Sequence, residues 1–129
     1  VGMTVEILNY GGHIKSIFVP NKNGKSIDVI IGMDNLDDYI NHDFYSGCIV
    51  GRYANRLKNG EFMLNNKIYK IKKQNKIFST HGGLIGFNKR IWNVKYVNNK
   101  DTVGVELEYL SKDGEQGYPG NLNVKVLYL

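Results

Sequence analysis

Apolar and polar residues alternate along much of this chain, and this two-residue period constrains the fold more than any other feature of the sequence. Such alternation is typical of β-strands with one buried face. It predicts strands at residues 4–8, 102–110 and 121–129, and short apolar runs predict strands at residues 14–19 and 28–32. A helical turn is predicted only at residues 35–40, where Asn35 is a candidate N-cap. The sequence therefore predicts an all-β fold.

Two turn signals indicate which strands are neighbours. Asn65-Asn66 lies between two strand-like segments, and asparagine tolerates the left-handed backbone that a two-residue hairpin requires. Residues 98–101, which contain Asn, Lys and Asp, separate a second such pair of segments. We therefore expect antiparallel hairpins over residues 61–72 and 91–110.

Length and composition indicate a single globular domain. The chain has 129 residues, of which 42% are hydrophobic and 22% charged, and these fractions are typical of a domain with a packed core. No apolar run approaches the roughly 20 residues that cross a bilayer, so no membrane partner is expected. The first residues lack the features of a targeting segment. We expect one domain over residues 1–129, located in the cytoplasm.

The net charge of +5 raises the question of nucleic-acid binding. The lysines are nevertheless spread along the chain, and the densest group is Lys70, Lys72, Lys73 and Lys76. Such a distribution favours solvated strand faces and turns over a binding stripe. We therefore expect no nucleic-acid partner.

Several residue types with functional potential have ordinary structural interpretations. Cys48 is the only cysteine, so no internal disulfide can form, and it is interpreted as a small buried hydrophobe. His13 and His42 lack any surrounding motif and are interpreted as ordinary loop or strand residues. Trp92 and Tyr118 could stack on a sugar, but burial is the commoner fate of such side chains in sheets.

Two polar motifs are the candidate functional residues. His81 is followed by two glycines, and histidine exchanges protons near neutral pH. Asn55 and Arg56 supply amide and guanidinium donors of the kind that hydroxyl-rich ligands need. Together these residues suggest a polyol pocket, although a histidine in this setting is more often a turn residue. Arg52, on the same motif, is interpreted as structural.

Residues 111–120 contain two carboxylates, Asp113 and Glu115, at a spacing that would allow acid and base roles in sugar chemistry. The density of glycine and proline there favours a shaped turn instead. We expect both carboxylates to cap backbone amides of that turn.

The alternation of the last predicted strand continues to Leu129. A native sheet usually blunts or covers such an edge. We therefore expect further strands to follow in a longer parent protein.

Three motifs occur in an order that resembles the aldose 1-epimerase (galactose mutarotase) family. They are Gly51-Arg52-Tyr53-Ala54-Asn55-Arg56, then His81-Gly82-Gly83 with Gly86-Phe87 and Trp92, then residues 111–120. The resemblance implies an antiparallel β-sandwich, the galactose mutarotase-like supersandwich, of which residues 1–129 form only the N-terminal part of a catalytic domain. It also implies an isomerase that interconverts the α and β anomers of a free hexose, such as galactose or glucose, without metal or cofactor.

The same resemblance implies roles for individual residues. Asn55, Arg56 and His81 match substrate-binding positions of the family. The principal acid and base of the family, a second histidine and a glutamate, have no matching position here, so no catalytic residue is assigned and the chain is expected to be inactive alone. Phe78-Ser79-Thr80 replaces the usual Asn-His-Leu before the His-Gly-Gly motif. The alternative function is a non-catalytic carbohydrate-binding β-sandwich module.

Overall fold

The computed structural model describes residues 2–43 and 45–129. Most of the regular secondary structure is strand, with one short helix, α1, and the 3-10 helices η1 and η2. The elements are β1 (Thr4–Ile7), β2 (Ile14–Pro20), β3 (Ser26–Asp28), α1 (Leu36–Asn41), β4 (Arg56–Lys58), β5 (Glu61–Leu64), β6 (Lys67–Lys70), β7 (Phe78–Thr80), η1 (Phe87–Lys89), β8 (Asn93–Asn98), β9 (Val103–Ser111), η2 (Glu115–Gly117) and β10 (Leu122–Tyr128).

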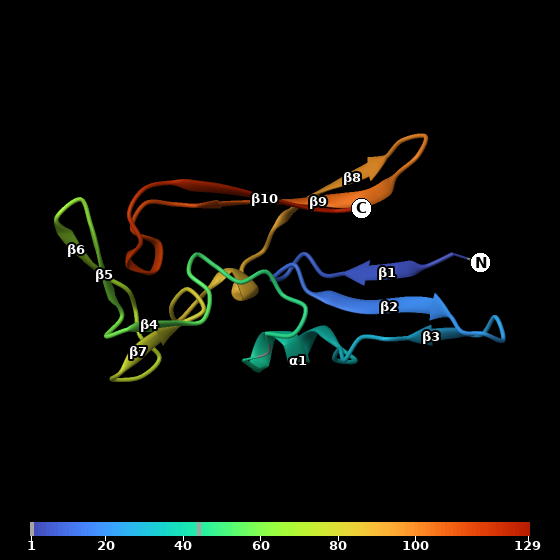
Figure 1. Cartoon of the computed structure of the whole chain (residues 1–129), viewed down its shortest axis with the longest axis horizontal. Helices are drawn as coiled ribbons and strands as arrows, with labels where there is room; N and C mark the ends of the chain where they lie inside the picture. The colour runs from blue at the N-terminus through green and yellow to red at the C-terminus, as the bar shows by residue number, and fades with distance from the viewer. Residues whose placement is uncertain (1, 44) are drawn as a thin grey trace.

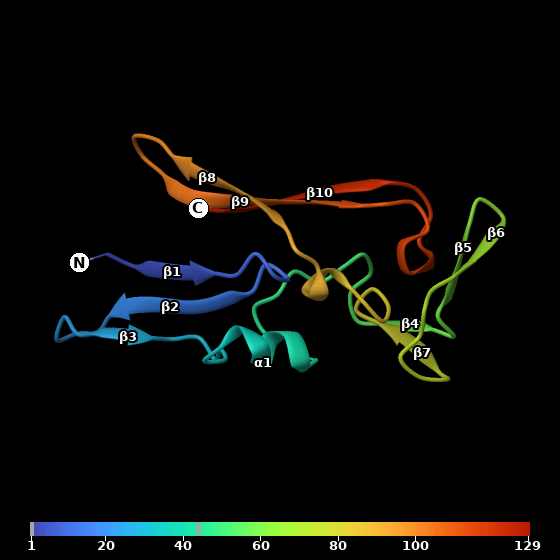
Figure 2. The ribbon, with the colours of Figure 1, turned by 180° about the vertical axis from the view of Figure 1, so that it is seen from behind.

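Two antiparallel sheets form the body of the molecule. Their strand orders are β1-β2-β3 and β10-β9-β8, and the smaller pairs β4–β7 and β5–β6 are separate from them. The two larger sheets lie one above the other, and the smaller pairs lie beyond the end of the β1-β2-β3 sheet, on the side to which β9 and β10 extend (Figure 1). The same arrangement is visible from behind in Figure 2. The predicted all-β antiparallel fold is confirmed.

The core lies where the two larger sheets approach η1. Its buried members are Phe87, Trp92 and Leu107, and partly buried residues of β1, β9 and β10 pack against them. Trp92 is 1% exposed, and its indole N–H donates to the carbonyl oxygen of Phe87 at 3.2 Å. Alternation places Leu107 of β9 opposite Val126 of β10, so their side chains share the buried face. The predicted burial of Trp92 is therefore correct.

The opposite face of this sheet is charged. Glu108 of β9 lies between Lys95 of β8, at 3.3 Å, and Lys125 of β10, at 3.7 Å. Exposed pairs of this kind contribute about 1 kcal/mol or less. These two lysines occupy a solvated strand face, as their sequence pattern predicted.

Both predicted hairpins are present. Asn65 and Asn66 adopt φ values of 51° and 59°, and these left-handed conformations close the two-residue turn between β5 and β6. In the second hairpin, the N–H of Asn99 donates to the carbonyl oxygen of Thr102 at 3.0 Å, between β8 and β9. Asparagine therefore sets the register locally in both hairpins.

The prediction of a strand over residues 28–32 is wrong. Strand β3 ends at Asp28, whose carboxylate accepts hydrogen bonds from the backbone N–H groups of Ile17 and Ile30, both at 3.0 Å. The Asp28 carboxylate thus takes the backbone N–H of Ile17, which a longer β3 would need as a donor for pairing with β2. Beyond it, Val29 and Ile31 are 57% and 84% exposed.

Helix α1 begins as the sequence predicted. The side chain of Asn35 accepts a hydrogen bond from the backbone N–H of Asp38 at 3.1 Å, as an N-cap does. The helix buries Tyr39, which lies against His13 with a ring-centroid distance of 4.9 Å. Over residues 2–43 and 45–129, no helix is long and apolar enough to span a membrane.

His13 lies in a loop, as expected, but it is fully buried, which the sequence did not indicate. Its exposed fraction is 0%, and its ring contacts the carbonyl oxygen of Ser46 through Nδ1 at 3.2 Å. Burial lowers the pKa of His13 below 6.5, and the backbone hydrogen bonds oppose that shift in part. The neutral ring is therefore the form that packs in this core.

Candidate functional site

The pairing of β4 with β7 brings the two polar motifs together. Arg56 lies opposite Thr80 in this pair, so residues 55 and 56 are next to residues 80 and 81. The sequence analysis predicted neither strand. Three residues in each strand are too few to show an alternating pattern.

Two hydrogen bonds connect Asn55 and His81 at the end of this strand pair. The N–H of His81 donates to the carbonyl oxygen of Asn55 at 2.9 Å, and the N–H of Asn55 donates to Nδ1 of the imidazole at 3.1 Å. Both residues have left-handed backbones, with φ values of 61° for Asn55 and 49° for His81. The imidazole is half-buried and contacts the ring of Tyr45, at a centroid distance of 4.6 Å.

Arg56 presents its guanidinium to solvent. The group lies 5.1 Å from the ring centroid of Phe78, the neighbouring aromatic residue of β7. Among the residues that the structure describes, neither the guanidinium of Arg56 nor the amide of Asn55 has a side-chain hydrogen bond, so their donors are available. The β4–β7 pairing therefore brings the backbones of Asn55, Arg56 and His81 close together, while the guanidinium of Arg56 extends toward Phe78.

The loop after His81 packs directly on the segment that carries Arg52. A Cβ atom on Gly82 would lie 1.7 Å from the carbonyl oxygen of Gly51, and Gly82 has a φ of +96°. Both facts require glycine at this position. The backbones of the 51–56 motif and of the loop after His81 are therefore in close contact.

Arg52 is structural, as predicted. Its guanidinium donates to Oγ of Ser111 at 2.9 Å and to the carbonyl oxygens of Ser111, Lys112 and Pro119 at 2.8 to 3.0 Å. These bonds tie the 111–120 turn to the 51–56 motif.

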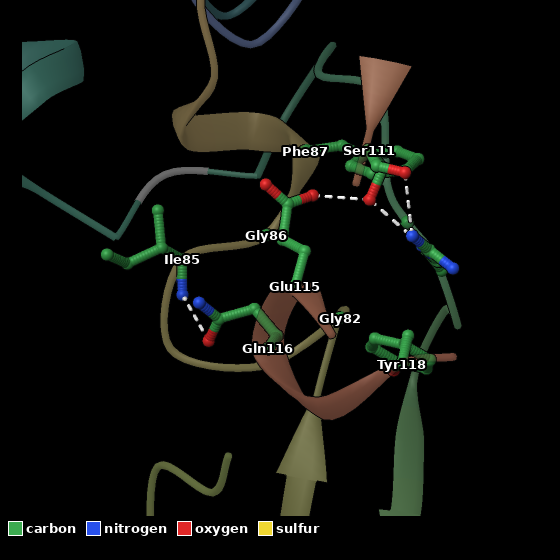
Figure 3. A pocket seen from close by; sticks show the side chains of 10 residues that line it. Gly82, Ile85, Gly86, Phe87, Ser111, Glu115, Gln116 and Tyr118 are labelled. Carbon is green, nitrogen blue, oxygen red and sulfur yellow. Dashed lines mark hydrogen bonds between the residues drawn. The ribbon is translucent and has the colours of Figure 1, made fainter. Parts of the chain in front are cut away.

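The prediction that Glu115 caps backbone amides is wrong. Its carboxylate accepts hydrogen bonds from the hydroxyls of Tyr109 and Ser111, and it pairs with Arg90 at 2.9 Å. Figure 3 shows Ser111 and Glu115 directed toward each other. Burial and the bond to Glu115 raise the pKa of Tyr109 to about 12, so this hydroxyl remains a donor. Glu115 is therefore a partly buried anchor of the turn.

Asp113, in contrast, caps the turn as predicted. Its carboxylate accepts a hydrogen bond from the backbone N–H of Gly120. The backbone N–H of Asp113 itself donates to the amide oxygen of Asn121 at 2.8 Å. The Asp113 carboxylate therefore stabilises the conformation of the turn.

The interior next to the histidine loop has no room for a ligand. The hollow lined by Gly82, Ile85 and Glu115 has no space for a water molecule. Gln116 closes one side of it, with its amide oxygen accepting from the N–H of Ile85 at 3.2 Å (Figure 3). Any ligand of this loop would therefore have to contact its exposed side.

A larger hollow of about 290 Å³ lies elsewhere, against Arg52, Tyr53, Leu57, Phe62 and Tyr118. Leu57 alternates with Arg56 along β4, so this hollow is on the other side of that strand. Its walls are mostly apolar, and the guanidinium of Arg52 is already bonded to carbonyl oxygens. A hydroxyl-rich ligand would find few partners there.

Sequence reasoning missed two residues that contact the histidine loop. Gln74 binds the backbone on both sides of His81, and Tyr45 contacts the imidazole ring. Neither belongs to a motif, and no local pattern marks them. Over residues 2–43 and 45–129, the structure shows no group of three His, Cys, Asp or Glu side chains that could hold a metal ion.

Cys48 is partly buried, and its thiol donates to the carbonyl oxygen of Tyr45 at 3.0 Å. Burial raises the pKa of this thiol to about 11. It therefore remains protonated near neutral pH and has the structural role that the sequence indicated.

Comparison with known proteins shows the family of this chain. The sequence profile of the family described as aldose 1-epimerase matches residues 1–129. The galactose mutarotase of Bos taurus is 40% identical over 126 residues, which cover 98% of this chain and 36% of that protein. The aldose 1-epimerase of Haemophilus influenzae is 39% identical over 127 residues, with 98% and 36% covered.

Solved structures agree with the sequence matches. The crystal structure of an aldose epimerase homologue from C. elegans has a TM-score of 0.86 and 31% identity, and the match covers 98% of this chain and 38% of that one. The chain thus spans about 36% of the length of the bovine relative. On the whole-length family match and this shared antiparallel sandwich, the chain belongs to the aldose 1-epimerase family.

Proposed function

We propose that the complete protein containing this chain interconverts the α and β anomers of a free hexose such as galactose or glucose, and that Asn55, Arg56 and His81 contact the sugar. The observation that carries the proposal is the β4–β7 pairing. It brings the backbones of Asn55 and Arg56 next to those of Thr80 and His81, and within the described residues the Arg56 guanidinium and the Asn55 side-chain amide have no hydrogen bond. A neutral sugar needs directional donors of this kind.

The reaction requires one proton to be removed and another to be supplied. A base takes the proton of the anomeric hydroxyl, the bond between C1 and the ring oxygen breaks, and an acid protonates the ring oxygen. Rotation about the C1–C2 bond and the reverse steps give the other anomer. Asn55 and Arg56 would orient the ring hydroxyls, and His81 would lie beside the ring oxygen.

Residues 1–129 would form the N-terminal portion of one β-sandwich catalytic domain. The chain spans about a third of its relatives, and by family resemblance the principal acid and base lie in the remainder. The 129-residue chain alone would then bind the sugar incompletely and leave the reaction rate unchanged. A cytoplasmic location remains a prediction from the sequence.

Polarimetry of freshly dissolved α-glucose and α-galactose tests this function. The complete protein should accelerate equilibration of at least one sugar well above the buffer rate, and the 129-residue chain should not. A rate equal to the buffer blank with both sugars would contradict the enzyme. Hexose binding by calorimetry without any acceleration would favour the non-catalytic carbohydrate-binding module instead.

A further inference from the structure

The hydrogen bond between Asn55 and His81 determines which ring nitrogen of the neutral imidazole carries the hydrogen. The backbone N–H of Asn55 donates to Nδ1 of His81 at 3.1 Å, so Nδ1 is an acceptor in the neutral ring. A neutral imidazole carries its hydrogen on the other nitrogen in that case. Nε2–H is therefore the donor that His81 can offer.

Gln74 holds the backbone on both sides of this histidine. Its amide nitrogen donates to the carbonyl oxygens of Thr80, at 2.7 Å, and Gly83, at 2.6 Å. Its amide oxygen accepts from the N–H of Thr80 at 2.8 Å. One side chain thus makes three hydrogen bonds to a segment of four residues with His81 inside it.

The segment needs such support because its backbone is permissive and locally strained. Gly82 and Gly83 have φ values of 96° and 109°, and His81 adopts a left-handed φ of 49°. A non-glycine residue in that conformation is held there by its surroundings. Tyr45 adds a second restraint, since its ring lies 4.6 Å from the imidazole and is tilted 40° to it.

We propose that Gln74 and Tyr45 are positioning residues that present His81 to the sugar as a fixed Nε2–H donor. Gln74 fixes the backbone, Tyr45 fixes the ring plane, and the Asn55 N–H fixes the tautomer. A fixed donor suits an oxygen that can only accept, such as the ring oxygen of a cyclic sugar, better than a hydroxyl. This inference rests on the proposed mutarotase function for its kinetic consequences, but not for its structural ones.

The main test compares Gln74→Ala with Asn75→Ala in the complete protein. Asn75 is the matched control because its side chain also bonds two backbone N–H groups, those of Ile77 and Phe78, but none around His81. Gln74→Ala should lower kcat about tenfold with KM changed less than twofold, because misplacement of a group near the reacting atoms costs rate. Asn75→Ala should leave both unchanged.

A second readout does not depend on activity. Long-range ¹H–¹⁵N spectra of histidine-labelled protein should show His81 as the Nε2–H tautomer in the wild type and as a mixture in Gln74→Ala. Tyr45→Phe, which keeps the ring contact, should behave as wild type, and Tyr45→Leu should lose kcat as Gln74→Ala does. If Gln74→Ala fails to fold, these Tyr45 variants test whether His81 is positioned by its neighbours.

The outcomes separate the two proposals. An inactive wild type with an Nε2–H His81 that is disturbed by Gln74→Ala would overturn the mutarotase function and leave the positioning intact. An active wild type whose kcat and His81 nitrogen signals are the same in Gln74→Ala would overturn the positioning. A wild-type His81 with its hydrogen on Nδ1 would also overturn it.

Discussion

Arg52 and Arg56 belong to one short motif and yet have opposite environments. The guanidinium of Arg52 bonds to Ser111, Lys112 and Pro119, and it joins distant parts of the chain. The guanidinium of Arg56 lies over Phe78 at an exposed strand end, with no hydrogen bond to the described part of the chain. The first side chain serves the fold, and the second is available to a ligand.

The histidines show the same contrast. His13 is fully buried between β1 and β2, and its ring is committed to Tyr39 and Ser46. His81 is half-buried, and only its Nδ1 is bonded within the described residues. Within each pair, residue type alone does not reveal the role, whereas the burial and internal contacts of the side chain do. Stability and ligand binding should therefore respond to different members of each pair.

The largest effect is expected for Arg52→Ala in the complete protein. It removes four hydrogen bonds and leaves the partly buried carbonyl oxygens of Ser111 and Pro119 without that donor. The free energy of unfolding should fall by about 3 kcal/mol in denaturant titrations. Arg52→Lys should recover only part of this loss, because an ammonium group cannot reach the same set of acceptors. An unchanged midpoint would show that Arg52 is as dispensable to the fold as Arg56.

Arg56→Ala, in contrast, should lower activity and leave stability almost unchanged. We expect kcat/KM for anomer interconversion to fall about 100-fold, which corresponds to about 2.7 kcal/mol. The free energy of unfolding should change by less than about 0.5 kcal/mol, because the side chain is exposed. Polarimetry and denaturant titration on the same sample measure both quantities. A loss of stability comparable to that of Arg52→Ala would remove the contrast between the two arginines.

The smallest effect is expected in the pH dependence of folding stability, through the ionisation of His13. Burial lowers the pKa of His13, so the unfolded chain binds this proton more tightly than the folded one. The stabilisation is fully present above pH about 6.5 and is lost as pH falls toward the folded-state pKa. His13→Asn keeps a donor for Ser46 but does not titrate, so its stability should fall less between pH 7 and pH 5. Identical pH profiles for both proteins would show that the His13 proton is not linked to folding.

Local patterns predicted the elements that local interactions define. The Asn65-Asn66 hairpin follows from the conformational preferences of two adjacent residues. The faces of β9 and β10 follow from alternation. In contrast, β3 ends at Asp28 because of a hydrogen bond to Ile17, which is distant in the sequence. No periodicity contains that information.

The candidate site divides in the same way. Asn55, Arg56 and His81 could be selected because their residue types and motif order carry a chemical signal. Gln74 and Tyr45 could not, because Gln74 acts through backbone atoms of the loop and Tyr45 through a contact across the fold. The pairing of Arg56 with Thr80, which brings the two motifs together, joins residues that are distant in the sequence.

The close approach of Gly82 to Gly51 has a practical consequence for protein engineering. Because a methyl group has no space at this crossing, a library randomised at position 82 should return only the parental sequence after selection for folded protein. Attempts to alter ligand preference at the proposed site are better directed at exposed neighbours such as Leu84, where side-chain diversity does not disturb the crossing.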